Sequence, residues 1–136
     1  TIFESQHHPT KLYELGNSQD LSFESLKDQR ILLVCGIGNP ITLVHTVEEY
    51  QPRQLELMAF SDHHQYSKKD ILRIQRKANI MKADIIITTQ KDEQKLLLYA
   101  NQLSIFVLAI EVRFLPEHGK SIKEMLNLYA QTCLPL

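Results

Sequence analysis

The sequence of 136 residues lacks several motifs that would complete an active site. It contains no G-x-x-x-x-G-K-[ST] phosphate loop and no second acidic cluster that could complete a site. No apolar run approaches the roughly 18 residues that a membrane-spanning helix needs, and no secretory signal peptide is recognisable. Internal repeats and low-complexity tracts are absent as well. We therefore expect one folded domain that carries part of an active site.

The charge balance and the cysteines exclude further classes of protein. The sequence contains fifteen Lys and Arg residues and sixteen Asp and Glu residues, which gives a net charge of −1. We expect no nucleic-acid partner, because nucleic acids bind strongly basic surfaces. Cys35 and Cys133 form neither a C-x-x-C pair nor a zinc-ligand spacing, which is typical of a soluble protein in a reducing cytosol. The chain begins with Thr1 rather than methionine, and we interpret it as part of a longer protein.

The first thirty residues differ in character from the rest. Residues 1–30 are polar and irregular, with one short candidate strand at 11–15 and a turn signal at 16–18. We predict a linker or hairpin-like arm that does not belong to the core.

Residues 31–136 alternate regularly between two kinds of segment. Apolar or β-branched runs that predict buried strands occupy residues 31–35, 55–60, 85–89 and 104–112. Helical patterns occupy residues 40–50, 67–81, 93–100 and 121–133. The second helix opens with a capping box from Ser67 to Asp70. This alternation predicts a three-layer α/β/α fold whose mainly parallel sheet has about four strands.

Three loops follow these strands, and the carboxyl ends of parallel strands meet at one edge of a sheet. The first loop contains Gly36 and Gly38 ahead of a helix. Two glycines there would let backbone amides approach a phosphate, but they also suit a tight structural turn. The dinucleotide fingerprint is incomplete, because Ile41 stands where its third glycine belongs.

The second loop contains Asp62, His63 and His64. His63 could act as a general base with Asp62 orienting its ring. The three side chains could instead bind zinc or manganese, or make only loop and cap hydrogen bonds. Adjacent residues rarely point at one target, so we expect His63 and His64 to have different roles.

The third loop runs from Thr88 to Asp92. Its hydroxyls, the Lys91 ammonium and the Asp92 carboxylate could hold a phosphate or a ribose. Alternatively, Thr89 caps the next helix and Asp92 lies at its positive end. Composition alone favours capping.

Taken together and in order, these loops resemble a known family. The segments CGIGNP at 35–40, FSDHHQY at 60–66 and TTQKD at 88–92 resemble the carboxyl-terminal half of the tetraacyldisaccharide 4′-kinases, the lipid A 4′-kinases of Gram-negative bacteria. The resemblance spans about residues 10–115. It implies transfer of the γ-phosphate of ATP, with Mg²⁺, to the 4′-hydroxyl of tetraacyldisaccharide 1-phosphate. The product would be lipid IVA, formed at the cytoplasmic face of the inner membrane.

The resemblance also implies what this chain leaves out. Members of the family have two α/β domains joined by a hairpin-like linker, and the amino-terminal domain holds the phosphate loop, the magnesium ligands and most of the ATP site. Residues 1–30 would then be the linker and residues 31–136 the carboxyl-terminal domain. That domain alone is expected to be inactive, without bound ATP, Mg²⁺ or other metal. Its partners would be the missing domain and the acylated lipid, with membrane contact through the other domain.

The family's Asp-His pair falls on Asp62 and His63. The resemblance implies that His63 helps an acid of the other domain to activate the sugar hydroxyl, or neutralises charge near the phosphoryl group. His64 matches a position that is often histidine in the family but has no clear catalytic role. Lys91 and Asp92 are in register with the family, although Gln90 replaces its usual glutamate. The resemblance implies no catalytic role for Gly36 or Gly38. One use of these glycines would be to let the backbones of the two domains approach each other closely.

Two other functions remain open from the sequence. A metal-dependent phosphoesterase would need further aspartates at strand ends, and Asp84 precedes its strand, at the wrong edge. A non-catalytic nucleotide-binding or interaction domain could be built on the Gly-Ile-Gly turn.

Overall fold

The computed structural model of the protein describes residues 3–17 and 19–116. In these residues one five-stranded sheet is combined with three α-helices and two short 3-10 helices. None of the described helices is long and apolar enough to cross a lipid bilayer. The helix predicted at 121–133 lies outside the described residues.

The sheet has the strand order β1-β5-β4-β2-β3. Four strands are parallel, and β1 runs antiparallel to β5 at one edge. The predicted α/β class and the mainly parallel sheet are therefore confirmed, with one strand more than predicted. The strands are β1 (Phe3–Glu14), β2 (Arg30–Cys35), β3 (Gln54–Ala59), β4 (Ile85–Thr89) and β5 (Phe106–Pro116).

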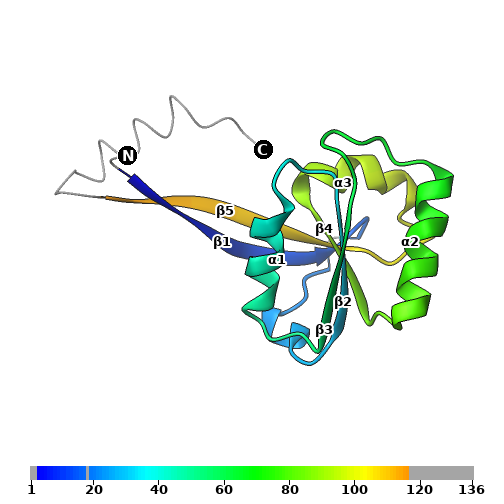
Figure 1. The fold of residues 1–136 in the computed structure, drawn as a ribbon, viewed down its shortest axis with the longest axis horizontal. Helices are drawn as coiled ribbons and strands as arrows, with labels where there is room; N and C mark the ends of the chain where they lie inside the picture. The colour runs from blue at the N-terminus through cyan, green and yellow to red at the C-terminus, as the bar shows by residue number, and fades with distance from the viewer. Residues whose placement is uncertain (1–2, 18, 117–136) are drawn as a thin grey trace.

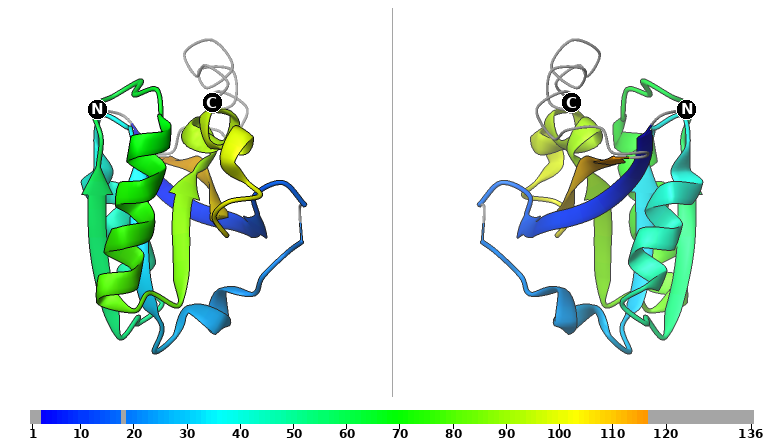
Figure 2. Two further views of the ribbon diagram at one scale, coloured as in Figure 1. Left: turned by 90° about the vertical axis from the view of Figure 1, so that its right-hand side faces the viewer. Right: turned by 90° about the vertical axis from the view of Figure 1, so that its left-hand side faces the viewer.

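Helices cover both faces of the sheet. The helix α1 (Pro40–Glu48) lies on one face, and α2 (Lys68–Met81) and α3 (Gln90–Leu96) lie on the other, as Figure 2 shows. A 3-10 turn, η2 (Leu97–Tyr99), continues from α3, and a second, η1 (Phe23–Leu26), precedes β2. The three layers agree with the sequence prediction.

Strand β2 lies between the two hydrophobic cores. Leu32 and Val34 belong to the core beneath α2 and α3, whereas Ile31, Leu33 and Cys35 belong to the core beneath α1. All five side chains are fully buried. The continuous apolar run in the sequence therefore has the expected cause, because a central parallel strand has no solvent face.

Local signals determine where the helices begin. Pro40 stands in the first turn of α1, where its missing N–H costs no hydrogen bond. Both hydrogen bonds of the predicted capping box between Ser67 and Asp70 are present at the start of α2. The Thr89 side chain caps α3, so this helix begins at Gln90, three residues earlier than predicted.

The prediction that residues 1–30 lie outside the core is wrong for the described part of that segment. Leu12, Leu15 and Leu26 are almost fully buried in the two cores. The reason is tertiary, because β1 pairs with β5, a strand about a hundred residues further along the chain. Figure 1 shows that the outer part of this two-stranded ribbon extends beyond the helices. The ribbon is thus both an edge of the sheet and a projection from it.

The connections reverse direction between β2 and β4. From β2 the chain passes through α1 to β3 on one side, and from β4 it passes through α3 to β5 on the other. Such a reversal leaves a crevice at the carboxyl ends of the two strands, where ligands of open α/β sheets usually bind. The loops that follow β2 and β4 are two of the three loops identified in the sequence.

Candidate functional site

The three predicted loops converge at the carboxyl edge of the sheet. The backbone N–H of His63 donates to the carbonyl of Gly36 over 3.3 Å. The ammonium of Lys91 lies 2.6 Å from Oδ1 of Asp62. These contacts join the first loop to the second and the second to the third, which confirms the predicted juxtaposition.

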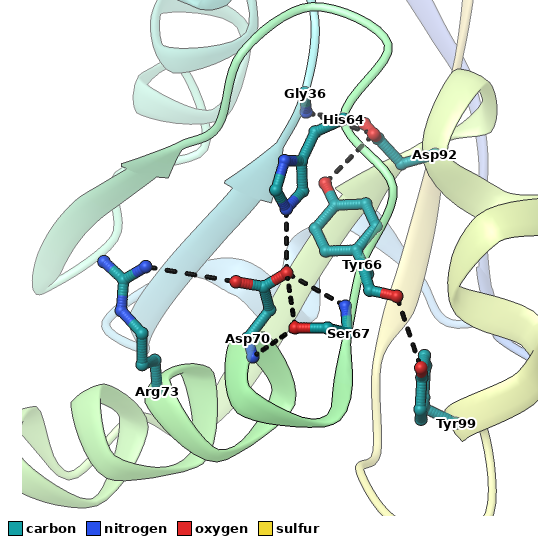
Figure 3. A network of polar contacts seen from close by, with 8 residues as sticks. All are labelled: Gly36, His64, Tyr66, Ser67, Asp70, Arg73, Asp92 and Tyr99. Carbon is teal, nitrogen blue, oxygen red and sulfur yellow. Dashed lines mark hydrogen bonds and ion pairs between the residues drawn. The ribbon is translucent and has the colours of Figure 1, made fainter.

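A buried carboxylate holds the crevice between β2 and β4 closed. Asp92 has no exposed surface, and its carboxylate accepts hydrogen bonds from the Gly36 N–H at 3.0 and 3.2 Å, the Tyr66 hydroxyl at 3.0 Å and the Thr89 hydroxyl at 2.6 Å. Figure 3 shows Gly36 and Tyr66 directed at this carboxylate. We call these four residues the Asp92 network. It fastens all three loops to one another through a single charged group.

The Asp92 network includes one of the backbone amides predicted to approach a phosphate. The Gly36 amide, the donor that a phosphate would use, already donates to Asp92. A Cβ at Gly36 would lie 3.0 Å from the carbonyl oxygen of Ser61 and 3.2 Å from Asp92, so close packing accounts for this glycine. The Gly36 amide is therefore not available to a phosphate at this turn.

Burial and the Asp92 charge keep two neighbouring groups protonated. Burial, with the negative charge of Asp92, raises the pKa of the Cys35 thiol to about 11. The same two causes raise the pKa of Tyr66 far above its ordinary range. At neutral pH Tyr66 is therefore a hydrogen-bond donor, and Cys35 is not a thiolate nucleophile.

His64 belongs to a second, partly buried contact, which we call the His64–Asp70 pair. Its Nε2 lies 2.8 Å from Oδ2 of Asp70, as Figure 3 shows, and its ring stacks on Phe60 with 4.6 Å between centroids. Burial acts to raise the pKa of Asp70, but the hydrogen bonds from His64 and Ser67 outweigh it and lower the pKa. His64 therefore connects its loop to the first turn of α2, which is a structural role.

The remaining residues of the loops form an exposed triplet of Asp62, His63 and Lys91. The side chain of His63 is 75% exposed and that of Asp62 is 44% exposed. Nε2 of His63 lies 3.7 Å from Oδ2 of Asp62. His63 has a φ of 63°, a left-handed conformation that is uncommon outside glycine and costs on the order of 1 kcal/mol. The hydrogen bond from the His63 N–H to Gly36 ties this residue to the Asp92 network, while its imidazole remains largely exposed.

The charges and contacts of Asp62, His63 and Lys91 indicate a different role for each side chain. The hydrogen bond from Lys91 lowers the pKa of Asp62. A carboxylate held by an ammonium is a weak proton acceptor, so Asp62 is better suited to orient His63 than to take a proton from a substrate. Lys91 is committed to Asp62 in this arrangement. Of the three side chains, the imidazole is the one available for proton transfer.

The other predicted site residues lie near the triplet or beneath it. Gly38 is exposed, and a Cβ there would make an ordinary contact of 3.6 Å with Asp62. Thr89 is buried and serves the Asp92 network. Sequence reasoning gave no role to Tyr66, although its hydroxyl reaches Asp92 across 26 positions. Only its place in the second motif singled it out.

The described residues offer no metal centre. Within residues 3–17 and 19–116 there is no group of three His, Cys, Asp or Glu side chains that could hold a metal ion. Asp84 lies at the opposite edge of the sheet, as predicted, and accepts the Arg30 N–H over 2.8 Å. A hollow of about 520 Å³ between α2 and β5 lies at that edge, and Asp84 is the one titratable residue that lines it.

Comparisons with known proteins agree with the geometry. The family model described as tetraacyldisaccharide-1-P 4′-kinase matches residues 1–129. The tetraacyldisaccharide 4′-kinase of Syntrophus aciditrophicus is 34% identical over 85% of this chain, and that of Phocaeicola vulgatus is 34% identical over 96% of it. The chain spans 31% and 37% of these two proteins, about a third of each.

A solved structure supports the fold. The crystal structure of LpxK from Aquifex aeolicus in complex with ATP matches 95% of this chain with a TM-score of 0.54 and 20% sequence identity. The match covers 35% of that chain. A relative from Arabidopsis thaliana, 26% identical over 85% of the chain, is named a probable mitochondrial tetraacyldisaccharide 4′-kinase. On the match of the family model and of these relatives, the chain belongs to the tetraacyldisaccharide 4′-kinase family.

Proposed function

We propose that this chain is the carboxyl-terminal domain of an ATP-dependent kinase that phosphorylates the 4′-hydroxyl of tetraacyldisaccharide 1-phosphate, giving lipid IVA at the cytoplasmic face of the inner membrane. The observation that carries the proposal is the family match over residues 1–129, combined with an exposed Asp62–His63 pair at the carboxyl edge of the sheet. ATP and Mg²⁺ would be held by a separate phosphate-loop domain, because this sequence contains no phosphate loop and its described residues contain no group of three His, Cys, Asp or Glu side chains that could hold a metal ion. The residues 1–30 would connect the two domains.

In this proposal His63 faces the cleft between the two domains. Its exposure leaves the imidazole accessible to a group supplied from outside the chain. It would assist an acid of the other domain in activating the sugar hydroxyl, or neutralise charge as the phosphoryl group is transferred. Asp62 and Lys91 would hold the histidine in place. Gly36 and Asp92 would contribute indirectly, by holding the loop that carries Asp62 and His63 in its conformation.

A chimaera provides the test. The carboxyl-terminal part of the Syntrophus aciditrophicus kinase is replaced by this chain, and transfer of labelled γ-phosphate to tetraacyldisaccharide 1-phosphate is measured with Mg²⁺. We expect the chimaera to transfer phosphate and this chain alone to show no transfer. His63→Ala in the chimaera should lower kcat roughly a hundredfold, without a change in melting temperature.

The matched control is His45→Ala, which removes an exposed histidine on α1. It should leave kcat unchanged. Phosphate transfer by this chain alone would show that the site is complete and the two-domain proposal is wrong. Full activity of the His63→Ala chimaera would disprove the role of His63 but not the family assignment.

A further inference from the structure

The outward face of α2 has an unusual composition. This helix of fourteen residues contains five of the fifteen Lys and Arg residues of the chain but a single acid, Asp70. Asp70 is buried at the start of the helix, where it accepts from His64 and Ser67. No carboxylate therefore remains on the outward side. The exposed residues of the helix are Lys68, Lys69, Leu72, Arg73, Arg76, Asn79 and Ile80.

Helical geometry gathers these residues into one stripe. Leu72, Arg76 and Ile80 follow one another at intervals of about one turn, on the side of the helix opposite Ile74 and Met81, which are buried. Leu72 is 58% exposed and Ile80 is 74% exposed. Two large aliphatic side chains thus project outward from a helix that already buries its inner face.

Three of the cations of this stripe have no ion-pair partner among the described residues. Among the described residues no ion pair involves Lys68, Lys69 or Arg76, whereas Lys77 at the margin of the stripe is paired with Glu56 over 2.6 Å. Arg73 lies 4.0 Å from Asp70 and over the ring of Phe60. The chain as a whole has a net charge of −1, so this positive face is a local concentration and not a property of the whole surface.

We propose that the outward face of α2 is a membrane-contact surface that docks on the anionic headgroups of a lipid bilayer. Its cations would bind the headgroups, and Leu72 and Ile80 would enter the boundary between headgroups and acyl chains. Interfacial helices combine Lys and Arg residues with large apolar residues that enter the headgroup boundary, and the outward face of α2 carries both kinds of residue. A nucleic acid would match the cations but not the two aliphatic side chains.

The position of α2 in the molecule fits this use. Figure 1 shows α2 at the outer flank of the domain, on the side opposite the projecting end of the β1–β5 ribbon. Within the described residues nothing packs over the stripe, since its residues are all exposed. This surface was not anticipated from the sequence, where membrane contact was expected through another domain. The proposal does not depend on catalytic activity.

Vesicle sedimentation tests the proposal with the 136-residue chain itself. Vesicles made from equal parts of phosphatidylglycerol and phosphatidylcholine are compared with vesicles of phosphatidylcholine alone, at low and at high salt. We expect binding to the anionic vesicles only, and we expect salt to weaken it because the headgroup charge is then screened. A short RNA is titrated in parallel. Absence of binding to anionic vesicles would overturn the proposal, and binding of RNA instead would assign the face to nucleic acid.

Two sets of variants separate the charges from the apolar residues. Lys69→Glu combined with Arg76→Glu should weaken vesicle binding more than about 25-fold, since each cation contributes about fivefold. Leu72→Ser combined with Ile80→Ser should weaken it about tenfold at unchanged charge.

The matched control is Lys27→Glu combined with Arg53→Glu, which makes the same charge change at exposed positions outside α2. It should bind vesicles as the unmodified chain does, and circular dichroism should show that all variants are folded. Equal loss in the control would mean that net charge alone governs binding. Unchanged binding by the serine variant would mean adsorption without insertion. Either result would overturn the proposal.

Discussion

His63 and His64 are neighbours in the chain, yet they belong to two different regions of the same loop. His64 is packed against Phe60 and bound to Asp70. His63 is largely exposed, in a left-handed backbone conformation. The inner region, made of the Asp92 network and the His64–Asp70 pair, is held by buried and partly buried hydrogen bonds to two carboxylates. The outer region, the exposed triplet, has few contacts of its own.

This difference indicates how the two regions depend on each other. A charged hydrogen-bond acceptor that is buried is costly unless its partners are all present, so the inner region holds one arrangement of the three loops. The outer triplet can then remain exposed without losing its geometry. In the proposed function, in which another domain completes the site, this arrangement would keep the triplet both positioned and accessible.

The largest effect is expected from removing the carboxylate at the centre of the inner region. Asp92→Ala leaves the Gly36 N–H and the hydroxyls of Tyr66 and Thr89 buried without their acceptor. We expect a loss of about 3 to 5 kcal/mol in the free energy of unfolding, measured by urea denaturation. Asp92→Asn should lose less, because the amide oxygen still accepts.

The control for this variant is Asp20→Ala, at an exposed aspartate paired with Lys11. It should change the free energy of unfolding by no more than about 0.5 kcal/mol. If Asp92→Ala were as stable as Asp20→Ala, the inner region would not be the part of the structure that holds the loops together.

A smaller effect is expected from the His64–Asp70 pair. His64→Ala should lower the free energy of unfolding by about 1 to 2 kcal/mol near neutral pH, whereas His45→Ala, at an exposed histidine, should have little effect. Because the folded pKa of Asp70 is lowered, its contribution is complete above about pH 4. It disappears as the pH falls through the lowered folded pKa.

Urea denaturation at a series of pH values measures this dependence. In Asp70→Asn the fall in stability over the acidic range should be shallower than in the unmodified chain. An equally steep fall in both proteins would show that other carboxylates account for the acid sensitivity.

The smallest effect on stability is expected in the outer triplet. Lys91→Ala removes the hydrogen bond that lowers the pKa of Asp62, so that pKa should rise toward its ordinary value. Nuclear magnetic resonance titration of the Asp62 carboxyl measures the change, and the denaturation midpoint should not move. Lys27→Ala is the control at an exposed lysine elsewhere. An unchanged Asp62 pKa would mean that the ion pair does not form in solution.

The sequence predicted most of the α/β unit because its signals are local. The apolar run at Ile31–Cys35 predicts a buried strand, and the cap at Ser67 predicts the start of a helix. The convergence of the three loops also followed from the sequence, because parallel strands place their carboxyl ends at one edge. The different roles of His63 and His64 were expected from their adjacency alone.

Other features were decided by contacts between distant segments. The pairing of β1 with β5 brings Leu12 into the core, and no local pattern in the first thirty residues shows this partner. The sequence could not distinguish a phosphate site at Gly36 from a structural turn. The structure shows that the Gly36 amide donates to Asp92, a residue 56 positions away in the sequence.

By itself, the sequence determined the class of fold, the order of the strands and helices between residues 31 and 112, the edge where the loops meet and the family to which the motifs point. Each of these depends on the period of apolar residues or on short motifs, which act over a few positions. Only the tertiary structure decided which polar side chains form hydrogen bonds in the protein interior and which remain exposed. A carboxylate has the same chemistry at Asp62 and at Asp92, and burial and hydrogen-bond partners give the two residues different roles.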